Sequence, residues 1–254
     1  MSNKISVVIP VFNGERNLRR TLLSIFHQSY KVDEVIIIND GSEDESRKII
    51  FSWKKKLPIF YFENEENMGV SFTLRKGISL SRGDLIFRID ADDEWRKNHV
   101  KNILFLMNNK KRSVLFASRA FYYFPKKEKK TFISKILSDK TIRKELMWDN
   151  PLVHSSVAFR KKDYFKTKGY KNFKCAQDYS LFIELLNIGE LSFSDKISVN
   201  YHVNESSLSR RNNKKCLKER FMNQWRALFL FNSESKLFAM KVFLILIIRT
   251  IFSK

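Results

Sequence analysis

Apolar residues in the first ninety positions form short runs, separated by segments in which they recur at helical spacing. The run Ile5–Ile9, closed by Pro10, is typical of a strand buried on both faces. Three more runs rich in β-branched and aromatic residues predict strands at Val35–Ile38, Ile59–Phe62 and Leu85–Ile89. Helices are expected between them, around Leu18–Phe26, from Ser42 to about Lys55, and from Asn67 to Leu80. Strands that alternate with helices in this way predict βαβ units and a mostly parallel sheet.

Ser42 and Glu45 have the spacing of a capping box, so the second helix is expected to begin at Ser42. The second half of the chain is less periodic. Residues 110–144 are dense in Lys and Arg and receive no assignment, whereas Tyr179–Leu186 has the apolar spacing of a helix. The region therefore predicts one helix and leaves its strands open.

The last fifty residues differ from the rest in composition. Residues 205–254 hold 11 basic and 3 acidic side chains, and Val242–Ile248 is an apolar run between Lys241 and Arg249. A membrane-spanning helix needs about 20 apolar residues, so this run is not expected to cross a bilayer. We interpret the tail as helices that either cap the rest of the chain, pair in a homodimer, or lie on an anionic membrane surface, and we favour the last.

Composition restricts the class of protein. The chain has 254 residues, 43% of them hydrophobic, with only 7 Gly and 4 Pro, which indicates a globular protein. The formal charge of +21 admits nucleic acid, an anionic membrane or a phosphorylated substrate as partner. Two cysteines are too few for a disulfide scaffold, and together with the polar start of the chain they favour a cytoplasmic location.

Carboxylates follow the apolar strands. Asp90 and Asp92 come directly after Leu85–Ile89, and in extended geometry they project to the same side. Crowded oxygen ligands at a strand end suit Mg²⁺ or Mn²⁺, although a solvated acidic turn is the alternative. Asp40 either binds a ligand or forms an Asx turn. Asp178 is either a helix N-cap or a general base.

Other chemistry has weaker support. His154 and His202 are isolated histidines that could equally be packing residues. Arg75 could neutralise a diphosphate or lie on a solvated helix face. The chain has no dinucleotide-binding glycine fingerprint, Walker-type loop, His-Glu-x-x-His or Cys-x-x-Cys motif, which argues against a dehydrogenase or a P-loop enzyme.

In their order and spacing, six elements of the chain resemble the family 2 glycosyltransferases of GT-A fold. They are Val8–Asn13, Glu15, Ile38–Ser42, Asn67-x-Gly69, Asp90–Asp93 and Gln177–Tyr179. The resemblance covers residues 5 to about 205 and implies a Rossmann-like α/β fold with a helical C-terminal extension. We expect a catalytic domain at 1–205, with a nucleotide-binding half at 1–95 and an acceptor-binding half at 96–205, followed by the tail at 206–254.

The resemblance also implies an activity, namely transfer of a sugar from a nucleotide donor, usually a UDP-sugar, to an acceptor hydroxyl with inversion. Asp178 would be the catalytic base, and Asp92 with His202 would hold Mn²⁺ or Mg²⁺. His154 and Gln177 would lie on the acceptor side. The residues implied to bind the nucleotide sugar are Pro10, Phe12, Asn13, Glu15, Asp40, Arg75, Asp90, Ala91 and Asp92.

The expected acceptor is a glycan or lipid-linked glycan of a bacterial surface polysaccharide such as O-antigen or capsule. The expected location is the inner face of the cytoplasmic membrane, to which the tail would attach peripherally. Alternatives are a polyprenyl-phosphate sugar synthase, a sugar-binding protein without activity, and a basic nucleic-acid-binding protein. The last is suggested by the aromatic stretch Phe121–Phe124 among lysines, but it leaves the strand-end carboxylates without a role, so nucleic acid is not an expected partner.

Overall fold

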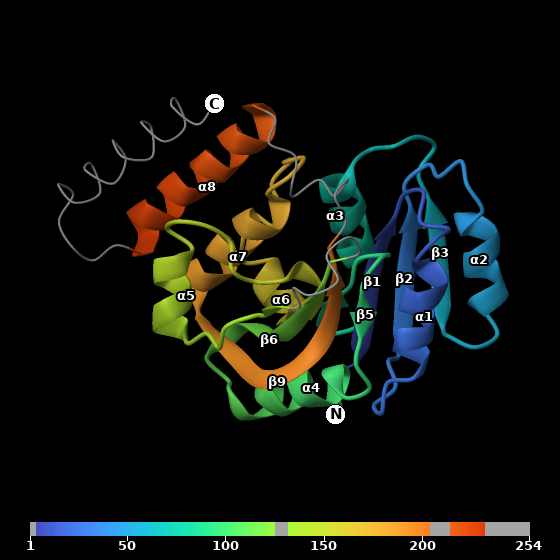
Figure 1. The fold of residues 1–254 in the computed structure, drawn as a ribbon, viewed down its shortest axis with the longest axis horizontal. Coiled ribbons are helices and arrows are strands. Elements are labelled where there is room, and N and C mark those ends of the chain that lie inside the picture. The colour runs from blue at the N-terminus through green and yellow to red at the C-terminus, as the bar shows by residue number, and fades with distance from the viewer. Residues whose placement is uncertain (1–3, 125–131, 204–213, 232–254) are drawn as a thin grey trace.

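The protein folds as a mixed α/β structure around one curled sheet (Figure 1). The structure, a computed structural model, describes residues 4–124, 132–203 and 214–231. The strands are ordered β3-β2-β1-β4-β8-β6-β9-β5 across the sheet, and β7 pairs with β6.

The first half is the predicted parallel βαβ array. Its four neighbouring strands β3, β2, β1 and β4 all pair in parallel. The elements in chain order are β1 (Ile5–Val11), α1 (Leu18–Phe26), β2 (Glu34–Asn39), α2 (Ser46–Trp53), β3 (Ile59–Glu63), α3 (Val70–Leu80) and β4 (Leu85–Arg88). The apolar runs were thus correctly identified as strands: β1, β2 and β4 lie in the interior of the sheet, and β3 forms its edge.

The second half makes the sheet mixed. Strand β8 pairs antiparallel with β4 and β6, and β9 runs parallel to β6 and antiparallel to β5. These elements are β5 (Glu94–Trp95), α4 (His99–Asn109), β6 (Ser113–Tyr123), β7 (Phe132–Ile133), α5 (Asp139–Glu145), η1 (His154–Ser156), β8 (Ala158–Arg160), α6 (Lys161–Tyr164), α7 (Gln177–Ile188), β9 (Glu190–His202) and α8 (Lys214–Phe231). The unassigned region 110–144 therefore contains a long strand.

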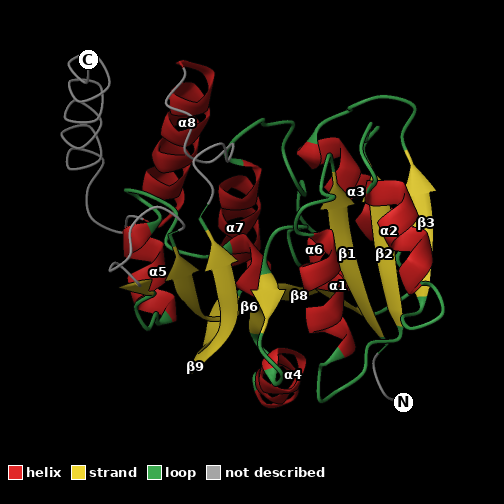
Figure 2. Cartoon of the chain, turned by 45° about the vertical axis from the view of Figure 1, so that its right-hand side comes forward, coloured by secondary structure: helices red, strands yellow, loops and turns green. Residues whose placement is uncertain are grey.

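Strands β1, β2 and β4 bury side chains on both faces, so the sheet separates two apolar layers. Val8 and Ile36 pack with residues of α3 and α7, while Val7 and Ile37 pack with residues of α1, α2 and α4. Figure 2 shows these helices standing on both sides of the strands. Alternate residues of one strand thus enter different layers, as the pleat requires.

The second helix begins four residues later than predicted. Its N-cap is Glu45, whose own side chain makes no capping hydrogen bond. The Ser42 hydroxyl instead donates to Asn39 and accepts from the Asn13 N–H at 3.0 Å. The capping-box interpretation was wrong, because Ser42 holds the loop after β2 against the loop after β1.

Helix α8 lies beside α7, at the end of the molecule opposite β3 (Figures 1 and 2). It forms the described part of the predicted helical extension. The apolar run Val242–Ile248 lies outside the described residues. Among the helices that are described, none combines the length and the apolar character needed to cross a membrane.

Candidate functional site

The strand-end residues meet at one edge of the sheet. Strand β1 pairs in parallel with both β2 and β4, with Val11 opposite Asn39 and Val8 opposite Arg88. Asp40 and Asp90 follow the ends of β2 and β4, so they lie on either side of the loop after β1. Phe12 in that loop is 49% exposed. The edge at which a doubly wound sheet binds ligands therefore carries most of the predicted residues.

Asp40 is 3% exposed and anchors the loop that leads into α3. Its Oδ1 accepts from Asn64 Nδ2 at 2.7 Å and from the Met68 N–H at 3.0 Å, and its Oδ2 accepts from the Gly69 N–H at 2.9 Å. A carboxylate offers about four acceptor positions, so three bonds leave room for one further donor. Neighbouring Gly41 has φ +71°, and a Cβ there would lie 2.8 Å from the Glu66 carbonyl carbon. A side chain at position 41 would separate the two loops.

Asn13 and Glu15 join the loop after β1 to the residues before α2. Asn13, at φ 49°, accepts the Glu43 N–H on its side-chain oxygen at 3.0 Å. Glu15 accepts the Glu45 N–H on Oε2 at 3.1 Å. Pro10 and Ala91 lie partly exposed at the same strand ends. The contact of these residues with a nucleotide stays a prediction.

A buried ion pair lies under the acidic run. Arg88, in β4, is 2% exposed, and its guanidinium donates to both carboxylate oxygens of Asp90. The backbone N–H of Asp90 donates to Ser155 Oγ at 3.0 Å. A buried arginine in a bidentate salt bridge fixes the orientation of its carboxylate partner. Asp90 is therefore a rigid part of the site.

Asp92 and Asp93 crowd this pair. Burial, and next the negative charge of Asp90, raise the pKa of Asp92 to about 6. Asp93 is fully buried, accepts from Ser155 Oγ, and accepts the His202 N–H at 3.0 Å, and burial raises its pKa well above the usual value. Repulsion among neighbouring carboxylates is relieved by protons or by a cation. This arrangement favours a cation at Asp92, the more exposed of the two.

Asp178 lies in the first turn of α7, not at its N-cap, which is Ala176. The N-cap alternative is therefore wrong. Its Oδ2 accepts from Asn150 Nδ2 at 2.9 Å, and its Oδ1 accepts the Tyr179 N–H at 2.7 Å. Burial raises the pKa of Asp178 to about 6, against the opposing effects of the Tyr179 N–H and the Arg88 charge. A carboxylate with this pKa is ionised at neutral pH and basic enough to accept a proton.

The remaining predicted residues lie around this cluster. His154 is buried with Nε2 2.7 Å from the Tyr170 hydroxyl, and burial keeps its pKa well below the usual value, so the ring is neutral. The Gln177 side-chain oxygen is buried and has no hydrogen-bond partner in the described part of the chain. Arg75 donates to the Tyr170 carbonyl at 2.9 Å, a contact that ties α3 to the segment before α7. Binding of donor or acceptor by these residues stays a prediction.

His202 lies beside Glu94, with Nε2 3.1 Å from Oε1, and burial lowers its pKa. No group of three or more His, Cys, Asp or Glu side chains among the described residues could hold a metal ion by itself. Mg²⁺ and Mn²⁺ nevertheless take much of their coordination from substrate phosphates and water. The carboxylate of Asp92 and the neutral imidazole of His202 fit an ion that takes its other ligands from phosphates and water.

Sequence reasoning missed three parts of the site: Arg88 as partner of Asp90, Asn150 as partner of Asp178, and Tyr170 beside His154. Only Arg88 carries a sequence signal, since a charged residue within an apolar strand needs a buried partner. Asn150 and Tyr170 lie in loops, where spacing gives no indication of contacts.

Comparisons with known proteins define the class. The solved structures include the 1–349 part of TarS from S. aureus in complex with UDP-GlcNAc, with TM-score 0.76 and 15% identity, covering 98% of this chain and 73% of that one. Mannosyltransferase PcManGT from Pyrobaculum calidifontis, in complex with GDP-Man and Mn²⁺, gives TM-score 0.65 at 13% identity, covering 100% and 71%. The curled mixed sheet with its strand-end acidic residues is thus a GT-A fold.

The family follows from the sequence comparisons. The family described as "Glycosyl transferase family 2" matches residues 6–168, and the chain belongs to it. A β-1,3-galactosyltransferase of Escherichia coli that uses UDP-Gal and α-D-GlcNAc-diphosphoundecaprenol is 32% identical over 189 residues, 73% of this chain and 69% of that protein. The amylovoran biosynthesis glycosyltransferase AmsE of Erwinia amylovora is 27% identical over 187 residues, 72% and 70% of the two chains. The protein is therefore a glycosyltransferase.

Proposed function

We propose that this glycosyltransferase moves a sugar from a UDP-sugar to a hydroxyl of a lipid-linked glycan, with inversion, during assembly of a bacterial surface polysaccharide. One observation carries the proposal: Asp178, with a pKa of about 6, lies within electrostatic reach of the Arg88–Asp90 pair at the ligand-binding edge of the sheet. The donor and acceptor in the name of the E. coli relative, and the UDP-GlcNAc bound by TarS, support this choice of substrates.

The chemistry assigns one task to each side chain. Asp178 accepts the proton of the acceptor hydroxyl as that oxygen attacks the anomeric carbon from the face opposite the leaving UDP. A single displacement with one base gives inversion. Asp92, together with His202, would hold Mn²⁺ or Mg²⁺, which would supply charge stabilisation for the departing diphosphate. The Mn²⁺ in the PcManGT complex supports this use of a divalent ion.

The test is a donor screen in the presence of Mn²⁺. UDP-Gal, UDP-GlcNAc, UDP-Glc and GDP-Man are each assayed for thermal stabilisation and for nucleotide release with a GlcNAc-diphosphate-lipid acceptor. We expect a UDP-sugar to stabilise the protein, EDTA to stop turnover, and Asp178→Asn to abolish turnover while UDP binding remains. Full turnover by Asp178→Asn, or by Asp92→Ala, would reject the assigned roles.

Peripheral attachment to an anionic membrane surface is the second part of the proposal. Helix α8 exposes Lys214, Lys215 and Lys218 at its start and Met222 and Phe229 further along, the latter 73% exposed. Basic side chains beside apolar ones suit the interface of an anionic bilayer. Such a position would bring the site to a lipid-linked acceptor.

A further inference from the structure

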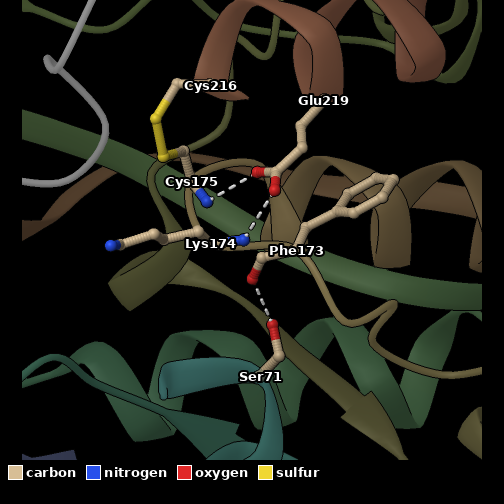
Figure 3. Close-up of a disulfide and its surroundings, with 6 residues drawn as sticks. All are labelled: Ser71, Phe173, Lys174, Cys175, Cys216 and Glu219. Carbon is tan, nitrogen blue, oxygen red and sulfur yellow. Dashed lines mark hydrogen bonds between the residues drawn. A yellow bond between two sulfur atoms is a disulfide. The ribbon is translucent and has the colours of Figure 1, made fainter. Parts of the chain in front are cut away.

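Helix α8 holds the segment that leads into the candidate base. Residues 173–176 come immediately before Gln177 and Asp178, the first residues of α7. The Glu219 carboxylate of α8 accepts the backbone N–H of Lys174 at 3.0 Å on one oxygen and that of Cys175 at 2.8 Å on the other (Figure 3). Glu219 is 5% exposed, so these two amides are its compensation for leaving water.

Two more residues of the same helix face contact this segment. Cys216, three residues before Glu219, forms a disulfide with Cys175, with 5.3 Å between the two Cα atoms. Asn223, four residues after Glu219 and fully buried, donates from Nδ2 to the Ala176 carbonyl at 2.9 Å. Spacings of three and four residues put all three side chains on one side of a helix. In the sequence the two cysteines favoured a cytoplasmic location, where disulfides are rare, and nothing there indicated this pairing.

The opposite side of the segment is fixed by α3. Ser71 Oγ donates to the Phe173 carbonyl at 2.6 Å (Figure 3). Ala176, the N-cap of α7, has no side chain that could cap the helix. The position of the first turn of α7, and with it Asp178, therefore depends on contacts from α3 and α8 and not on a local cap.

We propose that Glu219 is a positioning residue for sugar transfer. Together with Asn223 and the Cys175–Cys216 bond it fixes the backbone before Asp178, so that the carboxylate reaches the acceptor hydroxyl. The inference rests on the proposed role of Asp178 as base. Glu219 lies beyond residues 6–168, the part that the family description matches. A displacement of about 1 Å at a reacting group costs roughly 100-fold in rate, so this control of the backbone matters.

The experiment compares Glu219→Ala and Glu219→Gln with a matched control, Glu34→Gln. Glu34 is also a 5% exposed carboxylate that accepts two backbone N–H groups, those of Arg82 and Gly83. It lies at the start of β2, however, whereas Asp40 follows the end of that strand, about 20 Å away. Glu34→Gln therefore loses a buried carboxylate that accepts two backbone N–H groups, as Glu219→Gln does, but far from the candidate site.

Three quantities are measured on the full chain: amide hydrogen exchange of the peptide over residues 173–177, UDP affinity by calorimetry, and kcat for UDP release from the sugar nucleotide that the donor screen selects. For Glu219→Ala we expect exchange to be faster by about tenfold or more, and kcat to fall by about 10- to 100-fold with UDP affinity retained. For Glu219→Gln we expect an exchange rate and a kcat between those of the wild type and Glu219→Ala, since the glutamine amide oxygen can accept one of the two N–H groups. For Glu34→Gln we expect a lower midpoint of urea unfolding than for the wild type and an unchanged kcat.

The outcomes separate this inference from the proposed function. Faster exchange without a fall in kcat would overturn the positioning role, and so would an equal fall of kcat in Glu34→Gln. Should Glu219→Ala not fold, Glu219→Gln and Cys216→Ser provide the same comparison, with a smaller fall in kcat expected from each. Full turnover by Asp178→Asn would instead reject Asp178 as the base, whatever the exchange result.

Discussion

Asp178→Asn should make the protein more stable at neutral pH while removing its activity. The folded protein raises the pKa of Asp178 from 3.8 to about 6, mainly through burial. The folded state therefore disfavours the ionised carboxylate, and asparagine carries no charge that burial penalises. A residue kept at a cost in stability is what a proton-accepting role predicts.

The magnitude follows from linkage. A shift of about 2 pKa units corresponds to about 3 kcal/mol at about 1.36 kcal/mol per unit. Between the unfolded and folded pKa the native state binds more protons than the unfolded state, so wild-type stability falls as pH rises through this window and levels off above about pH 6. The variant lacks this loss. Its advantage over the wild type should therefore grow by about 2 kcal/mol between about pH 4.5 and pH 7.5.

Urea unfolding of both proteins, in EDTA and at several pH values, measures this difference from the midpoints and slopes. Groups that titrate alike in both proteins cancel in the subtraction. The loss of one hydrogen bond, from Asn150 or from the Tyr179 N–H, shifts the difference by a constant and leaves its pH dependence. A difference that stays flat across the pH range would show that Asp178 titrates normally, and the argument for a basic carboxylate would fail.

Two further predictions concern the surroundings of the site. The Asn150 side chain donates to Asp178 Oδ2, and this hydrogen bond favours the ionised carboxylate. Asn150→Ala removes the donor, so the acidic limb of the kcat–pH profile should move up by about 1 pH unit. An unmoved limb with lower kcat at every pH would assign Asn150 a structural role only. Full-length protein should float with anionic liposomes and a chain ending at Phe231 should float less, with neutral liposomes as control; equal flotation of the two chains would refute the tail as the attachment.

The parallel half of the fold could be predicted from the sequence because β1, β2 and β4 are buried on both faces, and these strands and the edge strand β3 each read as a continuous apolar run. Strand β6 (Ser113–Tyr123) could not be predicted, although it pairs with β9 from its first residue to its last. Lysines flank it, and its partner Glu190–His202 is distant in sequence, so no local pattern indicates the pair. The helix start at Ser42 failed for a related reason, since its hydroxyl bonds to Asn39 and Asn13 in preference to the helix.

The strand-end acidic residues could be named from the sequence, but not what each of them contacts. The position of Asp40 indicated a ligand or an Asx turn, whereas its carboxylate bonds mainly to a loop 24 to 29 residues further along. Arg75 was expected to neutralise a diphosphate or to lie on a solvated helix face, and its guanidinium donates to the Tyr170 carbonyl, 95 residues away. Contacts of this kind depend on tertiary packing, which periodicity and motif spacing do not contain.

The charge of the site is opposite to that of the chain. The protein carries a formal charge of +21, yet Asp90, Asp92 and Asp178 lie within electrostatic reach of one another around the buried guanidinium of Arg88. Arg88 is committed to Asp90 in a two-pronged contact and cannot also neutralise a diphosphate. A positive surface can draw an anionic donor to the protein over a long range, but at the strand ends the same donor meets carboxylates. A divalent ion at Asp92 would resolve this conflict, because it binds carboxylate and diphosphate together. This is the physical reason to expect that donor turnover requires the metal, whatever sugar the donor carries.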